Sequence, residues 1–165
     1  MNNRKLLDLI KKKAEYFSTE EIIQRSAPGE QEPQHTDRLK YVSRLVARYN
    51  LETFLEIKSR DRIDILEDID SDTLNDFTFR IEKYMDENAP GLADLKTYIL
   101  IVSTYLAFIV KKPLHPPGML FVGGQKIVEK DNKFYCPMKN KQLRTAFSLC
   151  KYCASRDISE IYEDL

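Results

Sequence analysis

The sequence has little that would mark a membrane protein or a strongly charged nucleic-acid binder. Its 165 residues include 26 basic and 26 acidic side chains, so no net charge creates a field around the whole molecule. The longest uncharged stretch, residues 97–110, would span about 21 Å as a helix, whereas a bilayer core is ~30 Å thick. No secretion signal is recognisable at the start of the chain. We therefore expect no membrane partner and interpret residues 97–110 as a buried core helix.

Cysteine and histidine are also scarce. The chain has three cysteines, Cys136, Cys150 and Cys153, and two histidines. An odd number of cysteines without a secretion signal argues against a disulfide-bonded scaffold. It favours reduced thiols and a cytoplasmic location. The remaining composition, 42% hydrophobic and 32% charged, is that of a globular domain and not of a disordered chain.

The common catalytic motifs are missing. The chain contains no HExxH, GxSxG or GxGxxG, and the glycine-containing stretch 118–124 has Gly124 where a phosphate-binding loop requires lysine. Asp68, Asp70 and Asp72 imitate the start of a calcium loop, but the glycine and glutamate that such a loop needs further on are absent. The sequence therefore identifies no substrate or reaction, and it leaves open whether the protein is an enzyme.

Apolar side chains recur at intervals of three and four residues through the first two thirds of the chain, as in amphipathic helices. We predict a mainly α fold, a helical bundle of about five or six helices with a small C-terminal β-hairpin and metal-binding module. The bundle would comprise residues 1–111, and residues 112–165 would pack on it within one structural domain. The predicted helices cover residues 3–17, 18–24, 36–49, 51–57, 60–69, 72–88 and 97–110, with Thr36 as a cap and Asn50 as a break.

The texture of the sequence changes after residue 112. Three prolines and three glycines fall within residues 113–124, which predicts a shaped loop. Two extended runs, 126–130 and 133–136, flank Asp131-Asn132 and predict a β-hairpin with a two-residue turn. Short helices are expected over residues 141–149 and 158–162.

The same segment holds the residues that favour a metal site. Cys150 and Cys153 form a C-x2-C pair, a spacing that lets two thiolates reach one metal ion. Cys136 ends the predicted hairpin, and His115 lies in the loop before it. We predict that His115, Cys136, Cys150 and Cys153 bind zinc as a closed tetrahedral Cys3His site, with an iron–sulfur cluster as the alternative cofactor.

Other interpretations of these residues stay open. The cysteines could be inert buried side chains, or Cys150 and Cys153 could be a thiol redox pair. If His115 is not a ligand, the three cysteines leave an open metal position and His115 becomes an acid–base group beside it, as in an enzyme.

Charge is segregated along the chain. Residues 111–156 contain ten basic and two acidic side chains, whereas residues 52–88 contain twelve acidic and five basic ones. The basic segment, with aromatic residues interleaved, could bind RNA, a nucleotide or another anionic ligand. Alternatively the two oppositely charged regions face each other, or the lysines only solvate the surface.

Four short motifs together resemble one protein family. They are His115-Pro116-Pro117-Gly118, Phe121-Val122-Gly123-Gly124, Tyr135-Cys136-Pro137 and Leu149-Cys150-Lys151-Tyr152-Cys153. This pattern resembles that of a family of uncharacterised proteins, a domain of unknown function found mainly in methanogenic archaea. The resemblance implies an archaeal cytoplasmic protein with a shared His and Cys constellation. The anaerobic life of methanogens also makes an iron–sulfur cluster a stronger alternative to zinc.

Overall fold

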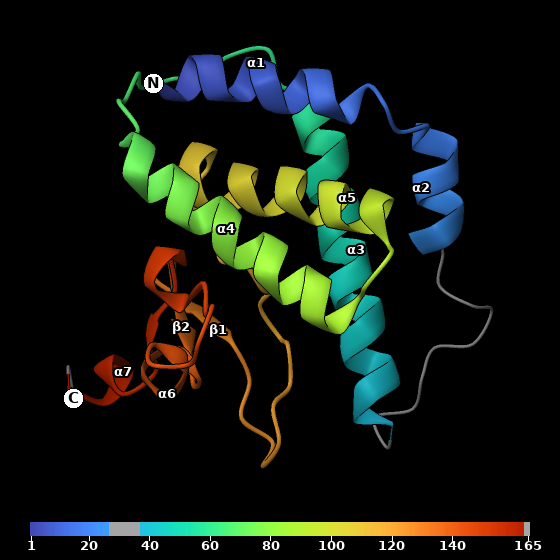
Figure 1. Ribbon diagram of the computed structural model, residues 1–165. Helices are drawn as coiled ribbons and strands as arrows, with labels where there is room; N and C mark the ends of the chain where they lie inside the picture. The colour runs from blue at the N-terminus through green and yellow to red at the C-terminus, as the bar shows by residue number, and fades with distance from the viewer. Residues whose placement is uncertain (27–36, 164–165) are drawn as a thin grey trace.

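The computed structural model describes residues 1–26 and 37–163, and its architecture is mainly helical, as predicted (Figure 1). The substantial helices are α1 (Asn3–Ala14), α2 (Thr19–Ser26), α3 (Arg38–Ser59), α4 (Ser71–Asn88) and α5 (Ala93–Thr104). A π-helical segment, η1 (Tyr105–Ile109), continues α5 without a break.

A small sheet follows in the C-terminal part of the chain. Its strands are β1 (Val128–Lys130), β2 (Lys133–Cys136) and β3 (Arg156–Asp157), in the order β1-β2-β3. The β1–β2 hairpin is antiparallel, with Val128 opposite Tyr135, and confirms the predicted hairpin. Asp131 and Asn132 both have positive φ (52° and 58°), the conformation of a type I′ turn. Short helical turns complete this part: α6 (Lys139–Gln142), the 3-10 turn η2 (Cys150–Tyr152) and α7 (Glu160–Glu163).

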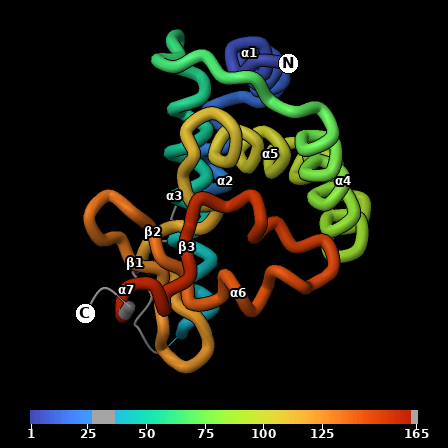
Figure 2. Tube along the Cα trace, turned by 90° about the vertical axis from the view of Figure 1, so that its left-hand side faces the viewer, coloured from blue at the N-terminus to red at the C-terminus, as the bar shows by residue number. Residues whose placement is uncertain are grey.

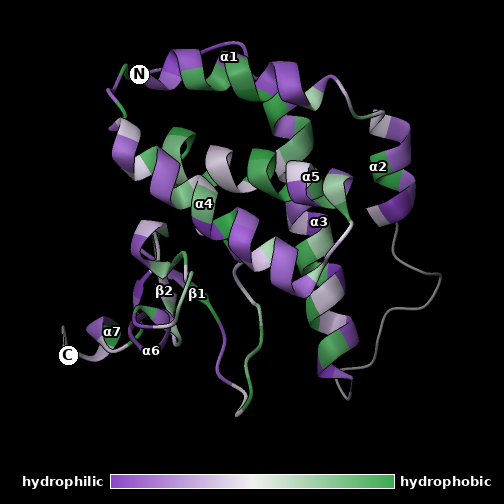
Figure 3. Cartoon of the chain, viewed as in Figure 1, coloured by the Kyte–Doolittle hydropathy of each residue, from purple (hydrophilic) through white to green (hydrophobic). Residues whose placement is uncertain are grey.

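The main core lies between α1, α3 and α5. Helix α1 buries one apolar face, including Leu7 and Ile10, against fully buried Phe54 of α3 and Tyr105 of η1. Figure 3 shows hydrophilic and hydrophobic residues alternating along α1 and α4, as expected for helices that cover a core with one face. At about 25 cal/mol per Å² of apolar surface removed from water, this burial is the chief stabilising contribution to the fold.

A second, smaller core joins the bundle to the C-terminal module. Buried Phe77, Ile81 and Met85 of α4 contact Leu114 and Tyr152 from the later part of the chain. Figures 1 and 2 show that part, coloured orange to red, gathered against one side of the helices. The segments that carry the cysteines are therefore held on the bundle by apolar contacts.

The structure corrects the prediction of a helix over residues 60–69. That segment is irregular because it pairs with the start of the chain. The Asn3 backbone N–H donates to the Glu67 carbonyl at 2.9 Å, and the Asn3 side-chain amide donates to the Ile65 carbonyl at 2.9 Å. Long-range hydrogen bonds to the N-terminal residues take the place of the local helical ones that the sequence pattern suggested.

Other boundaries also differ from those predicted. Asn50 does not interrupt α3, which is continuous, since the flanking residues Tyr49 and Leu51 pack against the main core. The helix expected over residues 141–149 shrinks to α6, and Phe147 beyond it has a positive φ of 59°. Residue Asp37 caps α3 by accepting a hydrogen bond from the Lys40 N–H, whereas the proposed Thr36 cap lies outside the described residues.

Among the described residues, no helix combines the length and the apolar character that crossing a bilayer would require. The stretch 97–110, interpreted from the sequence as a core helix, divides into α5 and η1. Its residues Ile101, Val102, Tyr105 and Leu106 are almost completely buried. This stretch is the centre of the core.

Candidate metal centre

The three cysteines lie in neighbouring parts of the C-terminal module. Cys136 ends β2 and is buried, while Cys150 and Cys153 are the first residue of η2 and the residue after it, and both are half-buried. All three are free thiols. Burial raises the pKa of the Cys136 thiol, and the nearby charges of Cys153 and Cys150 raise it further. The fold therefore brings three thiols within electrostatic range of one another.

Backbone N–H groups point at two of these sulfur atoms. The Met138 N–H donates to the Cys136 Sγ, and the Leu114 N–H donates to the Cys153 Sγ, each at 3.4 Å. Such hydrogen bonds favour the thiolate over the thiol, because they stabilise negative charge on sulfur. They are also the kind of outer-shell contact that orients metal-binding side chains.

His115 follows Leu114 directly and so lies in the segment that contacts Cys153. Its side chain is solvent-accessible, yet the surrounding protein disfavours the charged imidazolium and lowers its pKa. A neutral imidazole is the form that binds metals. Within residues 1–26 and 37–163, however, no three His, Cys, Asp or Glu side chains converge as a formed metal site. The four predicted ligands lie in one region, but their side chains do not converge on a common position that a metal ion could occupy.

Helix α3 anchors the segment that leads to His115. The Tyr49 hydroxyl donates to the Pro113 carbonyl at 2.6 Å. About two turns further along the helix, Glu56 accepts a hydrogen bond from the buried Tyr105 hydroxyl at 2.7 Å and pairs with Lys112 at 3.5 Å. Burial raises the pKa of Tyr49, and the neighbouring Cys153 raises it further.

Helix α4 anchors the other side of the region. Asp76 accepts hydrogen bonds from three groups: the Arg80 guanidinium at 2.8 Å, the Lys151 ammonium at 2.7 Å and the Tyr152 hydroxyl. These donors hold the pKa of Asp76 well below its ordinary value. Lys151 and Tyr152 are the two residues between Cys150 and Cys153, so one carboxylate fixes the C-x2-C turn on α4.

No sequence pattern assigned Asp76 to the cysteine region. Arg80 follows Asp76 by four residues, a spacing that predicts a helical ion pair, but nothing local relates Asp76 to Lys151. The ring of Tyr152 also packs edge-to-face on Phe77, with ring centroids 5.2 Å apart. A tyrosine between two cysteines was the available signal, since a large aromatic at that position needs a packing partner.

The structure also explains much of the charge segregation. Three ion pairs join the basic segment 111–156 to the acidic region 52–88: Lys111–Glu67, Lys112–Glu56 and Lys151–Asp76. Oppositely charged regions thus face each other, which was one of the alternatives. These lysines are engaged within the protein and are less available to an external anion.

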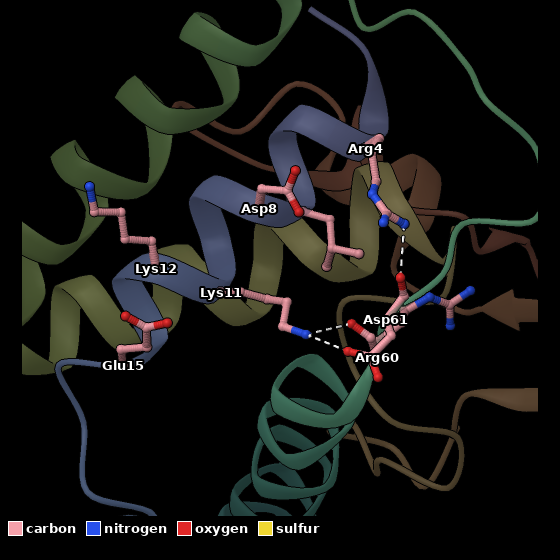
Figure 4. Close-up of a pocket in the computed structure, with 8 residues that line it drawn as sticks. Arg4, Asp8, Lys11, Lys12, Glu15, Arg60 and Asp61 are labelled. Carbon is pink, nitrogen blue, oxygen red and sulfur yellow. Dashed lines mark hydrogen bonds and ion pairs between the residues drawn. The ribbon is translucent and has the colours of Figure 1, made fainter.

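Two pockets lie elsewhere on the described part of the molecule. One, of about 420 Å³, is lined by charged side chains of α1 together with Arg60 and Asp61 (Figure 4). Two of its cations are engaged within the protein, since Lys11 pairs with Asp61 at 3.0 Å and Arg4 donates to the Asp61 carbonyl at 2.8 Å. The other, of about 470 Å³, lies between α2, α3 and α5. Neither contains any of the four predicted ligands.

The fold and this region define a small helical protein with a cysteine-bearing C-terminal module. The chain belongs to the family described as an uncharacterized protein conserved in archaea (DUF2115), whose model matches residues 2–158. The resemblance noted from the sequence motifs is thereby confirmed.

Relatives from methanogens cover nearly the whole chain. A UPF0305 protein of Methanocaldococcus jannaschii is 36% identical over 98% of this chain and 99% of its own length. A UPF0305 protein of Methanothermobacter thermautotrophicus is 27% identical over 94% of this chain and 96% of its own. Another, from Methanococcus maripaludis strain C7, is 32% identical over 67% of each. No solved structure matches the chain significantly.

Proposed function

We propose that this protein binds one zinc ion through Cys136, Cys150, Cys153 and His115, and that the metal staples the C-terminal module. The observation that carries the proposal is the proximity of three free thiols, two of which accept backbone N–H hydrogen bonds. Thiolates are soft ligands that suit zinc. His115 is the nearest histidine in the chain to this set, one residue after the donor to Cys153.

Zinc at this place would join segments that the protein anchors separately. The loop bearing His115 is held by α3 through Tyr49, and the C-x2-C turn is held by α4 through Asp76. A metal ion bridging them would add its binding free energy to folding, typically about 10–16 kcal/mol for structural zinc in peptides. The four ligand side chains do not converge in the described residues, so metal binding would have to draw them together.

A second candidate follows from the accessibility of His115. If the exposed His115 side chain is not a ligand, the three cysteines leave one metal position open, as in a metal or iron–sulfur enzyme or redox protein. His115 would then act as an acid–base group beside the metal. In either case the free thiols suit a reducing cytoplasm.

The test is metal content and visible absorption of the protein purified without oxygen. One zinc per chain in a colourless solution supports the structural site. A brown protein containing several irons per chain supports the cluster, and a folded protein that neither contains nor takes up metal contradicts both.

Two variants separate a closed site from an open one. In the closed Cys3His site, His115→Ala and Cys153→Ser both lose metal and both lower the melting temperature. If His115→Ala retains full metal content while Cys153→Ser loses it, the open position is correct. Lys126→Ala, an exposed change in the same module, serves as the control and should alter neither quantity.

A further inference from the structure

Lys139 contacts both cysteine residues of the C-x2-C turn. Its ammonium donates to the carbonyl oxygen of Cys150 and to that of Cys153, the latter at 2.9 Å. Lys139 itself lies three positions after Cys136 and directly after Met138, whose backbone N–H donates to the Cys136 thiol at 3.4 Å. One residue therefore ties the turn after β2 to the C-x2-C turn, segments separated by more than ten positions in sequence.

The ammonium charge of Lys139 lies close to the cysteines. The side chain is half-buried, and none of the ion pairs among the described residues involves it. Its ammonium instead contacts the two carbonyl oxygens of the C-x2-C turn. Zinc with three thiolates and a neutral histidine has a formal charge of −1, which one nearby ammonium would offset.

The carbonyl contacts also fix the direction of the cysteines. The Cys153 N–H donates to the Cys150 carbonyl at 3.2 Å, closing the turn, and Lys139 donates to that same carbonyl. With both carbonyls directed to Lys139, the turn is held in one orientation relative to Cys136. Outer-shell groups that orient ligands in this way typically change metal affinity 10–100-fold when they are mutated.

We propose that Lys139 is the positioning residue of the thiol site, which brings Cys136 and the C-x2-C turn together and sets the affinity for a thiophilic metal ion. This inference rests on the proposed metal-binding function. It assigns to Lys139 a role distinct from that of the ligands, because the lysine acts through the peptide groups and charge of the cysteines and not through a bond to the metal.

The experiment compares Lys139→Met, which keeps the length of the stem without the charge, with Lys139→Arg, which keeps a cationic donor. Lys141→Met is the matched control, an exposed lysine two residues further along. Zinc affinity is measured by competition with a chromophoric chelator. We expect Lys139→Met to bind zinc about 10–100-fold more weakly, Lys139→Arg to recover part of the loss, and Lys141→Met to match the wild type. Wild-type zinc affinity in Lys139→Met would overturn the proposal.

A second probe separates this inference from the metal function. Arsenite, As(OH)3, condenses with three neighbouring thiols to give As(SR)3 and three water molecules, and so reports assembly of the cysteines without zinc. If wild-type protein binds arsenite but not zinc, the metal function fails, and a weaker arsenite affinity of Lys139→Met still supports positioning by Lys139. Equal arsenite affinity of the two proteins would contradict it, as would wild-type protein that binds neither probe. Circular dichroism of each variant, with unchanged helix content, distinguishes a local loss of positioning from unfolding.

Discussion

The backbone N–H of Leu114 donates to the thiol of Cys153 at 3.4 Å, across 39 positions of sequence. This bond joins the loop that follows the central helix to the C-x2-C turn near the end of the chain. A different helix contacts each partner. Helix α3 hydrogen-bonds to the loop through Tyr49, and α4 forms an ion pair with the turn through Asp76. The thiol region therefore joins two parts of the fold, and substitutions on either helix should alter the positions of the cysteines.

Asp76→Asn should loosen the C-x2-C turn. The change keeps the shape of the side chain but removes the charge that holds Lys151 and Arg80. We expect the melting temperature to fall by a few degrees, with a loss of zinc affinity in the metal-bound protein. Glu87→Gln, an exposed change near the end of the same helix, is the control and should behave as wild type. Equal melting temperatures of Asp76→Asn and wild type would show that the network contributes nothing.

The same carboxylate predicts a pH dependence of the metal-free protein. Hydrogen bonds from Lys151, Tyr152 and Arg80 lower the pKa of Asp76 in the folded state, whereas an unfolded aspartate titrates near ~3.9. The stabilisation is therefore fully present above about pH 4 and is lost as the pH falls through the lower, folded-state value. Thermal melts between neutral pH and pH 2 should show a steeper decline for wild type than for Asp76→Asn. Parallel declines would contradict this assignment.

Phe77→Ala should strongly destabilise the fold. Phe77 is fully buried and packs edge-to-face on both Phe108 and Tyr152, so its loss leaves a cavity between α4, η1 and the cysteine turn. Such truncations typically cost about 3–5 kcal/mol of unfolding free energy. Phe79, two residues away on the same helix and 48% exposed, provides a matched Phe79→Ala control with a much smaller effect. Urea unfolding of both variants measures the difference.

Asn132→Val should weaken the β1–β2 hairpin. Asn132 has a φ of 58°, a left-handed conformation that asparagine tolerates and a β-branched residue does not. We expect a loss of about 1–2 kcal/mol for valine and little or no loss for Asn132→Gly, since glycine adopts positive φ without strain. Chemical denaturation of the two variants side by side tests this, and equal stability of the pair would exclude a type I′ turn.

The parts of the fold that the sequence predicted correctly are those whose causes are local. The hairpin was predictable because Asp131 and Asn132 are turn residues between two extended runs, and α4 because its apolar residues repeat at helical spacing. Strand β3 has only two residues and forms because it pairs with β2, so no local sequence pattern predicts it. Residues 60–69 have helical periodicity, but hydrogen bonds to the first residues of the chain prevail.

The same distinction applies to the candidate site. The four ligands were proposed from spacing and residue type, and three of them, the cysteines, lie near one another. The residues that hold the cysteine segments in place became visible only in the tertiary structure. Asp76 and Lys151 are 75 positions apart, and the contacts of Lys139 go to backbone carbonyls, which have no sequence signature. Metal binding by these four residues stays a prediction.

The parallel pairing of β3 with β2 has a consequence for the order in which the protein matures. Arg156 and Asp157 lie beside Tyr135 and Cys136, and the Ile158 N–H donates to the Cys136 carbonyl at 3.2 Å. A chain emerging from the ribosome exposes the helical bundle first. Strand β2 can pair with β1 at that stage, but its pairing with β3 requires that residues 156–158 have been synthesised. The surroundings of Cys136 are therefore completed only in the last stage of synthesis.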